Sequence, residues 1–371
     1  MNILCIDWAL TNFHNLVELA HDGHRVYMMS DVNVPTAYYK SLGVEVVDWM
    51  PSHSEKDEFV KERGIDLVIN QHPHVRYSVE GVKYVGLNVF SAHLETRKLW
   101  CRRGVEAVGV KAPRILDDIS IPCVVKTRKA VLNSELHCAW VVKDEEHLEW
   151  MKRNWGFDKT DYYVEEYIDG IEVNIEFVVS GGKWSISHCQ QSSGEEDAKL
   201  AGNFQHHTKH IRYHELSDDN RYLCLDESEK ILDWVATLGG SFQGQITGII
   251  KDGEFYFIEI NSRLGATNST PIFVRGDEYL KSLDGDPDLL GDAIYNADVE
   301  KMVVHPLIPT AYYPFHLHEK YGVSIPCGLD IINDKYLIAH TYRNQGAGIT
   351  IVDDHIPQEF KDELKRWHWY E

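Results

Sequence analysis

The sequence contains no long hydrophobic run and few basic residues. No window approaches the roughly 18 consecutive apolar residues expected of a membrane-spanning helix. Lys and Arg total 37 against 58 Asp and Glu, which gives a formal net charge of −21, and the cations form no cluster. General binding to duplex nucleic acid needs a basic face that displaces counterions from phosphates. We therefore expect neither a membrane protein nor a general nucleic-acid-binding protein, although a small phosphorylated ligand would need only a few local cations.

Paired cysteines are also missing. The seven cysteines are odd in number, scattered, and include no Cys-x-x-Cys pair. This usage favours reduced structural thiols over a disulfide framework or a zinc site. The first residues, Met1–Trp8, have the pattern of a strand, with neither the basic region nor the cleavage site of a secretory leader. Together these features predict a cytosolic protein.

Several signatures of catalytic or cofactor sites are absent from the sequence. The segment Asp7–Asn12, which follows the first predicted strand, has no glycine fingerprint for a dinucleotide pyrophosphate, so we predict no NAD-binding domain. No Gly-x-Ser-x-Gly stretch supports covalent catalysis. His206–His210 fits no helical zinc motif, and we interpret these histidines as part of a substrate-facing loop, Ser192–His210. One of them could accept the proton of an amine substrate.

Short apolar runs alternate with helical patterns over the first ninety residues. Strands that are separated by helices are typical of a parallel, doubly wound sheet, so this part of the chain is predicted to be α/β. The predicted strands are Asn2–Ile6, Arg25–Met29, Val44–Val47, Leu67–Ile69 and Tyr84–Leu87, and the predicted helices are Asn12–Asp22, Thr36–Leu42 and Glu55–Arg63.

The pattern changes to α+β beyond residue 90. Ala92–Arg103 predicts one helix. The strands Gly244–Ile250 and Glu254–Ile260 flank an Asp-Gly pair, which is typical of a hairpin. The last seventy residues have the pattern of a mixed α+β segment without recognisable chemistry. The other predicted elements are the strands Pro122–Lys126, Ala139–Val142, Tyr162–Tyr167 and Glu172–Val179 and the helices Glu145–Asn154 and Glu227–Leu238.

The segment Phe257–Gly265 carries the clearest chemical pattern. Strict alternation on a strand places Glu259, Asn261 and Arg263 on one face, with Ile258 and Ile260 on the other. A carboxylate and an amide oxygen two residues apart are suitable ligands for Mg²⁺, and an arginine on the same face can bind phosphate oxygens. Alternatively, the segment is an amphipathic strand whose polar face is only solvated.

Two further segments could bind a nucleotide. Tyr163–Glu172 has the pattern of a strand, a short linker and a second strand, and such a linker can offer backbone groups to an adenine edge. A surface turn is the alternative, since Asp-Gly is common in turns. Lys126 at the end of an apolar run and Lys98 on the preceding helix could hold phosphates, or both could be solvated lysines.

The order and spacing of these segments together resemble the signature of ATP-grasp ligases. The resemblance covers roughly residues 1–300 and is sharpest at 160–175 and 242–272. Within this superfamily, the stretch from Phe242 to Ile272 is most similar to glycinamide ribonucleotide synthetase (phosphoribosylamine–glycine ligase). The segments that carry the resemblance are Lys98, Lys126, Glu165–Glu172 and Glu259–Gly265.

The resemblance implies an α/β chain with the ATP-grasp fold. We expect an N-terminal Rossmann-like domain at 1–90 and a linking helix and connection at 91–119. An ATP-grasp lid at 120–185 and a central α+β catalytic domain at 186–300 would follow, with a C-terminal α+β segment at 301–371. The nucleotide would be clamped between the lid and the central domain.

The resemblance also implies roles for individual residues. Lys98 and Lys126 would contact phosphates, Glu166 and Ile168 would offer backbone groups to adenine, and Glu172 would bind the ribose. The remaining implied roles are Mg²⁺ (alternatively Mn²⁺) ligation by Glu259 and Asn261, a catalytic role for Arg263 and Lys126, and a place for Glu165 in the nucleotide site.

The implied reaction is ATP-dependent ligation of a small-molecule acid and an amine. A carboxylate attacks the γ-phosphate to give an acyl-phosphate, and the amine then displaces phosphate to form an amide. Glycine and an amine on a sugar phosphate are the substrates implied first. The alternatives are a ligase for a modified nucleotide, a peptide or a natural-product amine, a non-catalytic scaffold, and a kinase that stops at the phosphorylated product. The oligomeric state stays open between a monomer and a homodimer.

Three departures from the family pattern concern the substrates and the lid. The segment Thr127–Ser134 after Lys126 contains no glycine, where the family has a glycine-rich loop over the phosphates. Ala266–Asn268 replaces an Asp-Pro-Glu run, and the first βα loop lacks the glycine-rich motif of the relatives. These changes indicate that part of the substrate site differs from that of the relatives.

Overall fold

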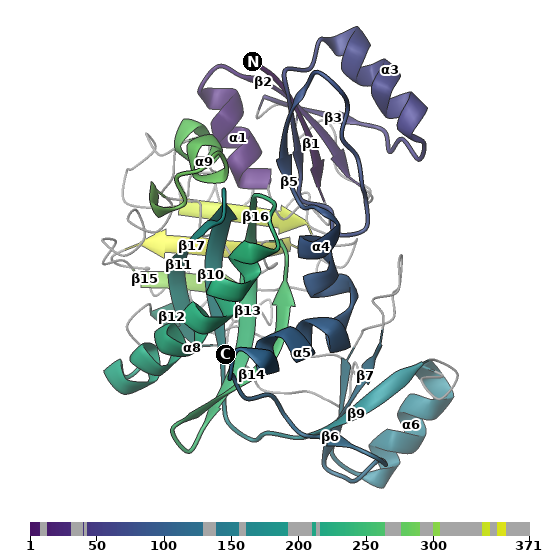
Figure 1. Cartoon of the computed structure of the whole chain (residues 1–371), viewed down its shortest axis with the longest axis vertical. Coiled ribbons are helices and arrows are strands. Elements are labelled where there is room, and N and C mark those ends of the chain that lie inside the picture. The colour runs from purple at the N-terminus through teal and green to yellow at the C-terminus, as the bar shows by residue number, and fades with distance from the viewer. Residues whose placement is uncertain are drawn as a thin grey trace, which may run out of the picture.

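A computed structural model of the protein describes four sheets and the helices that cover them (Figure 1). The predicted helix Thr36–Leu42, apart from residue 40, and the predicted loop Ser192–His210, apart from its last residue, lie outside the described residues. The described residues are 1–7, 13–30, 40, 43–128, 139–155, 161–191, 210–212, 216–263, 276–289, 300–304, 336–341 and 347–353.

The N-terminal sheet is parallel throughout and has the strand order β3-β2-β1-β4-β5. Side chains of β1 alternate between two cores: Ile3 and Cys5 face α1, while Leu4 and Ile6 face α3. This arrangement confirms the predicted doubly wound sheet. Its elements are β1 (Asn2–Asp7), α1 (Phe13–His21), β2 (Arg25–Ser30), β3 (Val44–Val47), α3 (His53–Arg63), β4 (Leu67–Asn70) and β5 (Lys83–Gly86).

The helix that we predicted at 92–103 is wrong as a single element. The structure has two helices, α4 (Val89–Thr96) and α5 (Lys98–Ala107), which meet at Arg97 with φ −130° and ψ 72° (Figure 1). Asn88 caps the first helix, and the hydroxyl of Thr96 donates back to the carbonyl of Ala92, a contact that often bends helices. The break makes Lys98 the first residue of a helix with a new direction.

A small sheet, formed by β6, β9, β7 and β8 in that order, lies at the lower right of Figure 1. Cys123, Val125 and Val164 point toward helix α6 and form its core. The alternate positions, among them Lys126 and Glu165, therefore point away from α6. The elements are β6 (Ile115–Leu116), β7 (Cys123–Thr127), β8 (Ala139–Val142), α6 (Glu145–Trp155) and β9 (Tyr162–Glu166).

The central sheet is antiparallel with the order β11-β10-β13-β14. Helix α8 lies across the face that carries Val173, Ile175 and Phe177, and these residues share one apolar core with α5 and α8 (Figure 1). The turn between β13 and β14 has positive φ at Asp252 and Gly253, which confirms the predicted hairpin. The elements are β10 (Ile171–Ser180), β11 (Lys183–Gln191), α8 (Asp218–Thr237), β13 (Phe242–Lys251) and β14 (Glu254–Asn261).

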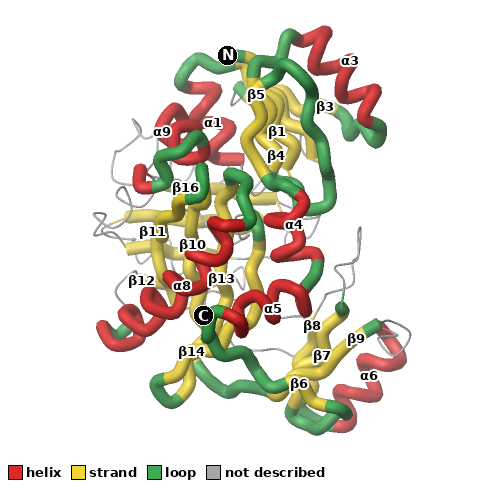
Figure 2. The backbone as a smooth tube through the Cα atoms, viewed as in Figure 1, coloured by secondary structure: helices red, strands yellow, loops and turns green. Residues whose placement is uncertain are grey.

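Two of the predicted domain boundaries do not coincide with a change of sheet. The chain leaves the small sheet after residue 166 and enters the central sheet at residue 171, whereas the predicted lid extended to residue 185. Helix α9 (Gly276–Leu283) shares the core of the N-terminal sheet through Tyr279 and Leu283. A fourth sheet crosses the predicted boundary at 300; its order is β12 (His210–Arg212), β15 (Glu300–Val304), β17 (Ala347–Asp353) and β16 (Tyr336–Thr341) (Figure 2).

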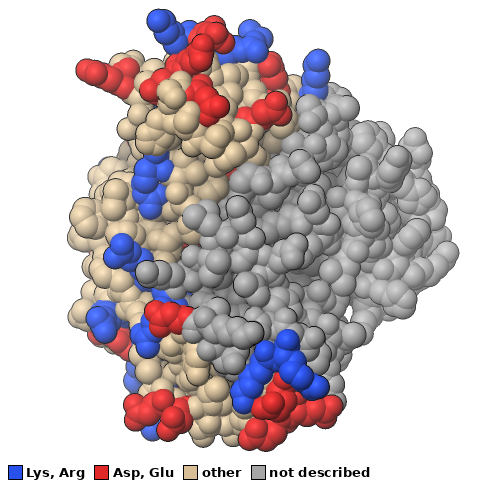
Figure 3. Space-filling model, turned by 90° about the vertical axis from the view of Figure 1, so that its right-hand side faces the viewer, with Lys and Arg blue, Asp and Glu red and all other residues tan. Residues whose placement is uncertain are grey.

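Charged side chains of both signs are interspersed on the described surface (Figure 3). On the described part of the face in Figure 3, Lys and Arg side chains lie in small separate groups, and some of these groups lie beside acidic side chains. Within the described ranges, no helix is both long and apolar enough to cross a membrane.

Candidate functional site

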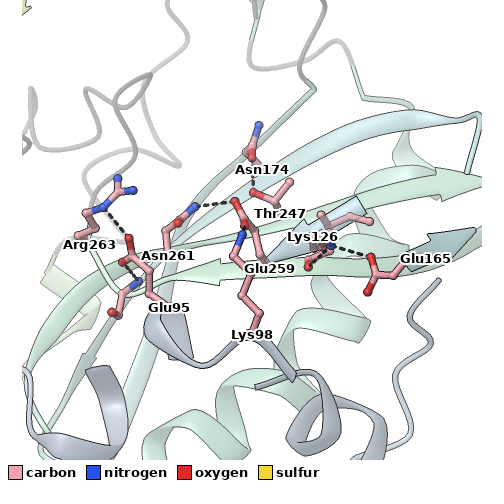
Figure 4. A network of polar contacts seen from close by, with 11 residues as sticks. Glu95, Lys98, Lys126, Glu165, Asn174, Thr247, Glu259, Asn261 and Arg263 are labelled. Carbon is pink, nitrogen blue, oxygen red and sulfur yellow. Dashed lines mark hydrogen bonds and ion pairs between the residues drawn. The ribbon is translucent and has the colours of Figure 1, made fainter. Parts of the chain in front are cut away.

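Polar side chains from three elements meet between the small sheet and the central sheet (Figure 4). Helix α5 contributes Lys98, the small sheet contributes Lys126, and β14 contributes Glu259. Lys98 Nζ lies 3.0 Å from Glu259 Oε2, and Lys126 Nζ donates to the carbonyl of Ile258 at 3.2 Å. The structure therefore brings together residues that are up to 161 positions apart in the sequence.

A β-bulge sets the direction of Glu259. Thr247 of β13 lies opposite Glu259, but its neighbour Gly248 lies opposite Phe257, so Ile258 is an extra residue in β14. Phe257 and Ile260 both join the apolar core. The strict alternation that we predicted, with Ile258 in the face of Ile260, is therefore wrong, because the extra residue shifts the phase of the strand.

If β14 alternated regularly and Ile258 were paired, Glu259 would lie on the same face as Phe257 and would enter the apolar core. The extra residue instead places it on the face of Thr247, whose hydroxyl donates to the side-chain oxygen of Asn174 at 2.9 Å. Ile258 has no partner residue in the β13 ladder, and its carbonyl accepts from Lys126. One irregularity thus aims the carboxylate and provides an acceptor for a neighbouring lysine.

Glu259 is an ionised carboxylate. Lys98 beside it lowers the pKa of the Glu259 carboxyl to about 2, with further contributions from Lys126 and from the Asn261 amide. Asn261 Nδ2 donates to Glu259 Oε1 at 3.3 Å, so the two predicted metal ligands lie side by side as expected. One carboxylate and one amide side chain on the same face form a donor set that could hold Mg²⁺.

Arg263 is held by a carboxylate that sequence reasoning missed. Glu95 of α4 accepts from Arg263 Nε at 3.1 Å and from the backbone N–H of Ser262 at 3.2 Å. Both charged side chains are about nine-tenths buried, and the end of the Arg263 guanidinium points away from Glu95 (Figure 4). The sequence did contain a signal for Glu95. It is an acidic residue directly after the apolar positions Ala92 and Leu94, in the same predicted helix as the site residue Lys98.

Glu165 lies in a buried charge cluster. Its Oε2 lies 2.7 Å from Lys126 Nζ, and its Oε1 lies 2.6 Å from Arg102 Nη1. The exposed fractions of the three side chains are 3%, 4% and 8% for Glu165, Lys126 and Arg102. Arg102 lies four residues after Lys98 on α5, and we did not predict it as a site residue.

Two hydrogen bonds to Arg114 fix the end of β9, where the linker between the two sheets begins. The backbone N–H of Glu166 donates to the carbonyl of Arg114, and the Glu166 carboxylate accepts from the backbone N–H of Arg114 at 2.7 Å. Ile168 is buried. Glu172 is two residues before Asn174 on β10, so it lies on the same sheet face as Thr247 and Glu259. The predicted ribose position therefore shares a face with the predicted metal ligands.

Some predicted site segments cannot be placed. The substrate-facing loop Ser192–His210 and the segment Leu264–Ile272 lie outside the described residues, apart from the backbone of His210. In the part of the chain that the structure describes, no group of three or more His, Cys, Asp or Glu side chains is arranged to hold a metal ion. A metal bound by Glu259 and Asn261 would have further coordination positions open to substrate oxygens.

Comparison with known proteins gives few sequence matches but consistent structural ones. No family model matches the chain. A D-alanine–D-alanine ligase from Fervidobacterium nodosum is 26% identical over 182 residues, which are 47% of this chain and 54% of that protein. The chain thus spans about half the length of the curated relative that it matches.

Solved structures match nearly the whole chain. The L-amino acid ligase from Bacillus licheniformis has a TM-score of 0.67 at 15% identity, covering 99% of this chain and 97% of that chain. The N5-carboxyaminoimidazole synthetase from Staphylococcus aureus has a TM-score of 0.66 at 10% identity, with coverages of 99% and 97%. At this identity the likeness concerns the fold. The protein therefore has the α/β fold of the ATP-grasp ligases.

Proposed function

We propose that this protein is an ATP- and Mg²⁺-dependent ligase that joins a carboxylate to an amine through an acyl-phosphate. The observation that carries the proposal is the site in Figure 4, where two lysines from different elements converge on the pair Glu259 and Asn261. Similarity to a D-alanine–D-alanine ligase and to an L-amino acid ligase supports the reaction class.

In this proposal the nucleotide lies between the small sheet and the central sheet. The ammonium groups of Lys98 and Lys126 bind phosphate oxygens, because both are largely buried cations between the small sheet and the central sheet. Ile168 offers backbone groups to the adenine, and Glu172 accepts from the ribose hydroxyls. Since the backbone N–H of Glu166 already donates to Arg114, only its carbonyl would serve the adenine edge.

Glu259 and Asn261 would hold Mg²⁺, with Mn²⁺ as the alternative. Their donor set fits an ion that takes few protein ligands and keeps phosphate oxygens. When bound, the ion supplies charge compensation for the transferring phosphoryl group. Glu259 stays ionised at neutral pH because Lys98 lowers its pKa. Arg263, fixed through Nε by Glu95, orients its terminal nitrogens toward the charge that develops on the phosphoryl oxygens.

The reaction balances without a covalent enzyme intermediate. A carboxylate oxygen of the acid forms a bond to the γ-phosphorus as the bond to ADP breaks. The amine nitrogen then bonds to the acyl carbon, phosphate leaves, and the nitrogen loses one proton. The protein contributes mainly position and charge compensation to these steps.

The acid is proposed to be a small amino acid, with glycine first, and two classes of amine remain. Phosphoribosylamine follows from the sequence resemblance. An unphosphorylated amine, such as a second amino acid, is favoured by the carboxyl ends of β1 and β4, where the strand order reverses and ligands of open α/β sheets bind. Of the residues that the structure describes there, Asp7, Asn70 and Gln71 are buried, polar and without positive charge.

The experiment that tests the proposal measures ADP release with Mg²⁺ and ATP across amino acids, with and without phosphoribosylamine or a second amino acid. Glu259→Gln should abolish turnover while ATP still binds. Hydroxylamine trapping should reveal the acyl-phosphate. A stable phosphorylated product without any amide would indicate a kinase. Wild-type protein that binds ATP but is silent across the panel would indicate a scaffold or an acid outside the panel.

A further inference from the structure

Glu165 has two cationic partners where one would balance its charge. One carboxylate oxygen lies 2.6 Å from Arg102 and the other lies 2.7 Å from Lys126. All three side chains are at least nine-tenths buried. A buried carboxylate without a counter-ion is strongly unfavourable, so a lysine that was the sole partner of Glu165 could not leave it at low cost.

The two partners come from different parts of the fold. Lys126 belongs to the small sheet, as does Glu165, whereas Arg102 comes from α5. Lys98 lies four residues before Arg102, on the same side of the helix. Helix α5 therefore brings one cation to Glu259 of the central sheet and a second cation to Glu165 of the small sheet.

Lys126 also contacts the strand that carries Glu259. Its ammonium donates to the carbonyl of Ile258, the residue before Glu259, so it lies between the buried anion and the proposed phosphate position. A nucleotide phosphate must compete with Glu165 for this ammonium group. The outcome of that competition depends on whether Glu165 keeps another counter-ion.

We propose that Arg102 is a positioning residue that keeps Glu165 neutralised, so that Lys126 can bind a nucleotide phosphate. The inference rests on the proposed function and adds a residue to it. Arg102 touches no substrate in this scheme and acts only through Glu165. Its other partner, Glu106, is about half exposed and lies on the same helix, so Glu106 supports the guanidinium but does not replace Glu165.

The test measures ATP binding by calorimetry in the presence of Mg²⁺, with thermal melting of every variant. Arg102→Met should weaken ATP binding by about tenfold or more, because Lys126 is then the only counter-ion of Glu165. Arg102→Lys should retain most of the affinity. The matched control, Glu106→Gln, should bind ATP like the wild type.

Second-site variants separate charge compensation from packing. In Arg102→Met with Glu165→Gln, no buried anion competes for Lys126, so ATP affinity should return toward the wild-type value. Glu165→Gln alone should bind ATP at least as tightly as the wild type, which keeps the test decisive if Arg102→Met fails to fold. A double variant weaker than Arg102→Met, or a weakened Glu165→Gln, would overturn the inference.

The two proposals can fail separately. If the wild-type protein binds no ATP, the proposed function is wrong and this inference falls with it. If the wild type binds ATP and Arg102→Met binds it equally well, only the role of Arg102 is wrong.

Discussion

At the scale of single residues, the site depends on buried charges that are fixed by other buried charges. Glu95 engages both Arg263 and the backbone of Ser262, so the arginine has little freedom around Nε. The guanidinium geometry makes this restraint directional, because one edge binds Glu95 while the terminal nitrogens point elsewhere. The position of Arg263 is therefore set from α4, outside the strand that carries it.

We predict that Glu95→Gln lowers kcat for ADP release by about tenfold, less than the 10²–10³ typical of deleting a transition-state donor. The amide keeps an acceptor for Ser262 but loses the charge that orients Arg263. The KM for ATP should change little, since Glu95 does not contact the lysines. Steady-state kinetics on the substrate pair that passes the ADP-release screen measures both constants. An unchanged kcat, or a loss confined to KM, contradicts the assignment.

Sequence reasoning found the charged residues better than their partners. Lys98, Lys126, Glu165, Glu259 and Asn261 were all predicted, and the structure brings them together. Their roles toward a nucleotide and a metal stay predictions. Glu95 and Arg102 were missed because ion pairs across 63 and 168 positions leave no local pattern.

At the scale of elements, the position of α5 decides where two of the cations lie. The helix packs against α8 at Gly104, where a Cβ atom would lie 2.1 Å from Trp234 Cζ2. The indole of Trp234 also contacts Trp100, with ring centroids 5.6 Å apart, so it cannot move away without disturbing a second ring. Glycine at this position therefore allows the close approach of the two helices.

We predict that Gly104→Ala destabilises the protein by up to about 2 kcal/mol, measured by urea unfolding. Overpacking costs roughly 1–3 kcal/mol and outweighs the ~1 kcal/mol that alanine gains over glycine within a helix. In a Trp234→Leu background the same change should be neutral or stabilising, since the clash is removed. Equal losses in the two backgrounds would show that the close approach is not the cause.

Sequence patterns predicted best the helices and strands in which apolar residues recur at a constant spacing from one end to the other. Strand β1 and its neighbours alternate cleanly between two cores, and their bounds agree with the prediction within one or two residues. The break at Arg97 and the extra residue Ile258 were not predictable, because each interrupts an otherwise regular pattern. The change of sheet after β9 depends on pairing with β13, which is distant in the sequence.

At the scale of the whole molecule, ion pairs connect helix α5 to both the small sheet and the central sheet. Lys98 and Glu259 join α5 to the central sheet, and Arg102 and Glu165 join the same helix to the small sheet. The pair of Lys98 and Glu259 requires an ionised Glu259 carboxylate, whose pKa Lys98 lowers. The free energy of unfolding should therefore decrease as the pH falls through the acid range.

We predict that the stability advantage of the wild type over Glu259→Gln decreases as the pH falls from about 4.5 toward 2. The folded-state pKa of Glu259 is lowered to about 2 from an ordinary value of 4.5, mainly by Lys98. A lowered carboxyl pKa contributes stability above the unfolded-state value, and this contribution is lost as the pH falls through the folded-state value. Chemical unfolding of both proteins across this range, without nucleotide, measures the difference. A difference that is constant with pH contradicts the ion pair.

The extra residue at Ile258 limits how the site could be transplanted. A hairpin that received Glu259, Asn261 and Arg263 on a regular strand would show the right residues at the right spacing. On such a strand, a carboxylate two residues after Phe257 would lie on the same face as Phe255 and Phe257. It would therefore enter the apolar layer, since the host strand would lack the extra residue that shifts the alternation. The information that makes this segment functional therefore includes a position whose side chain has no part in the chemistry.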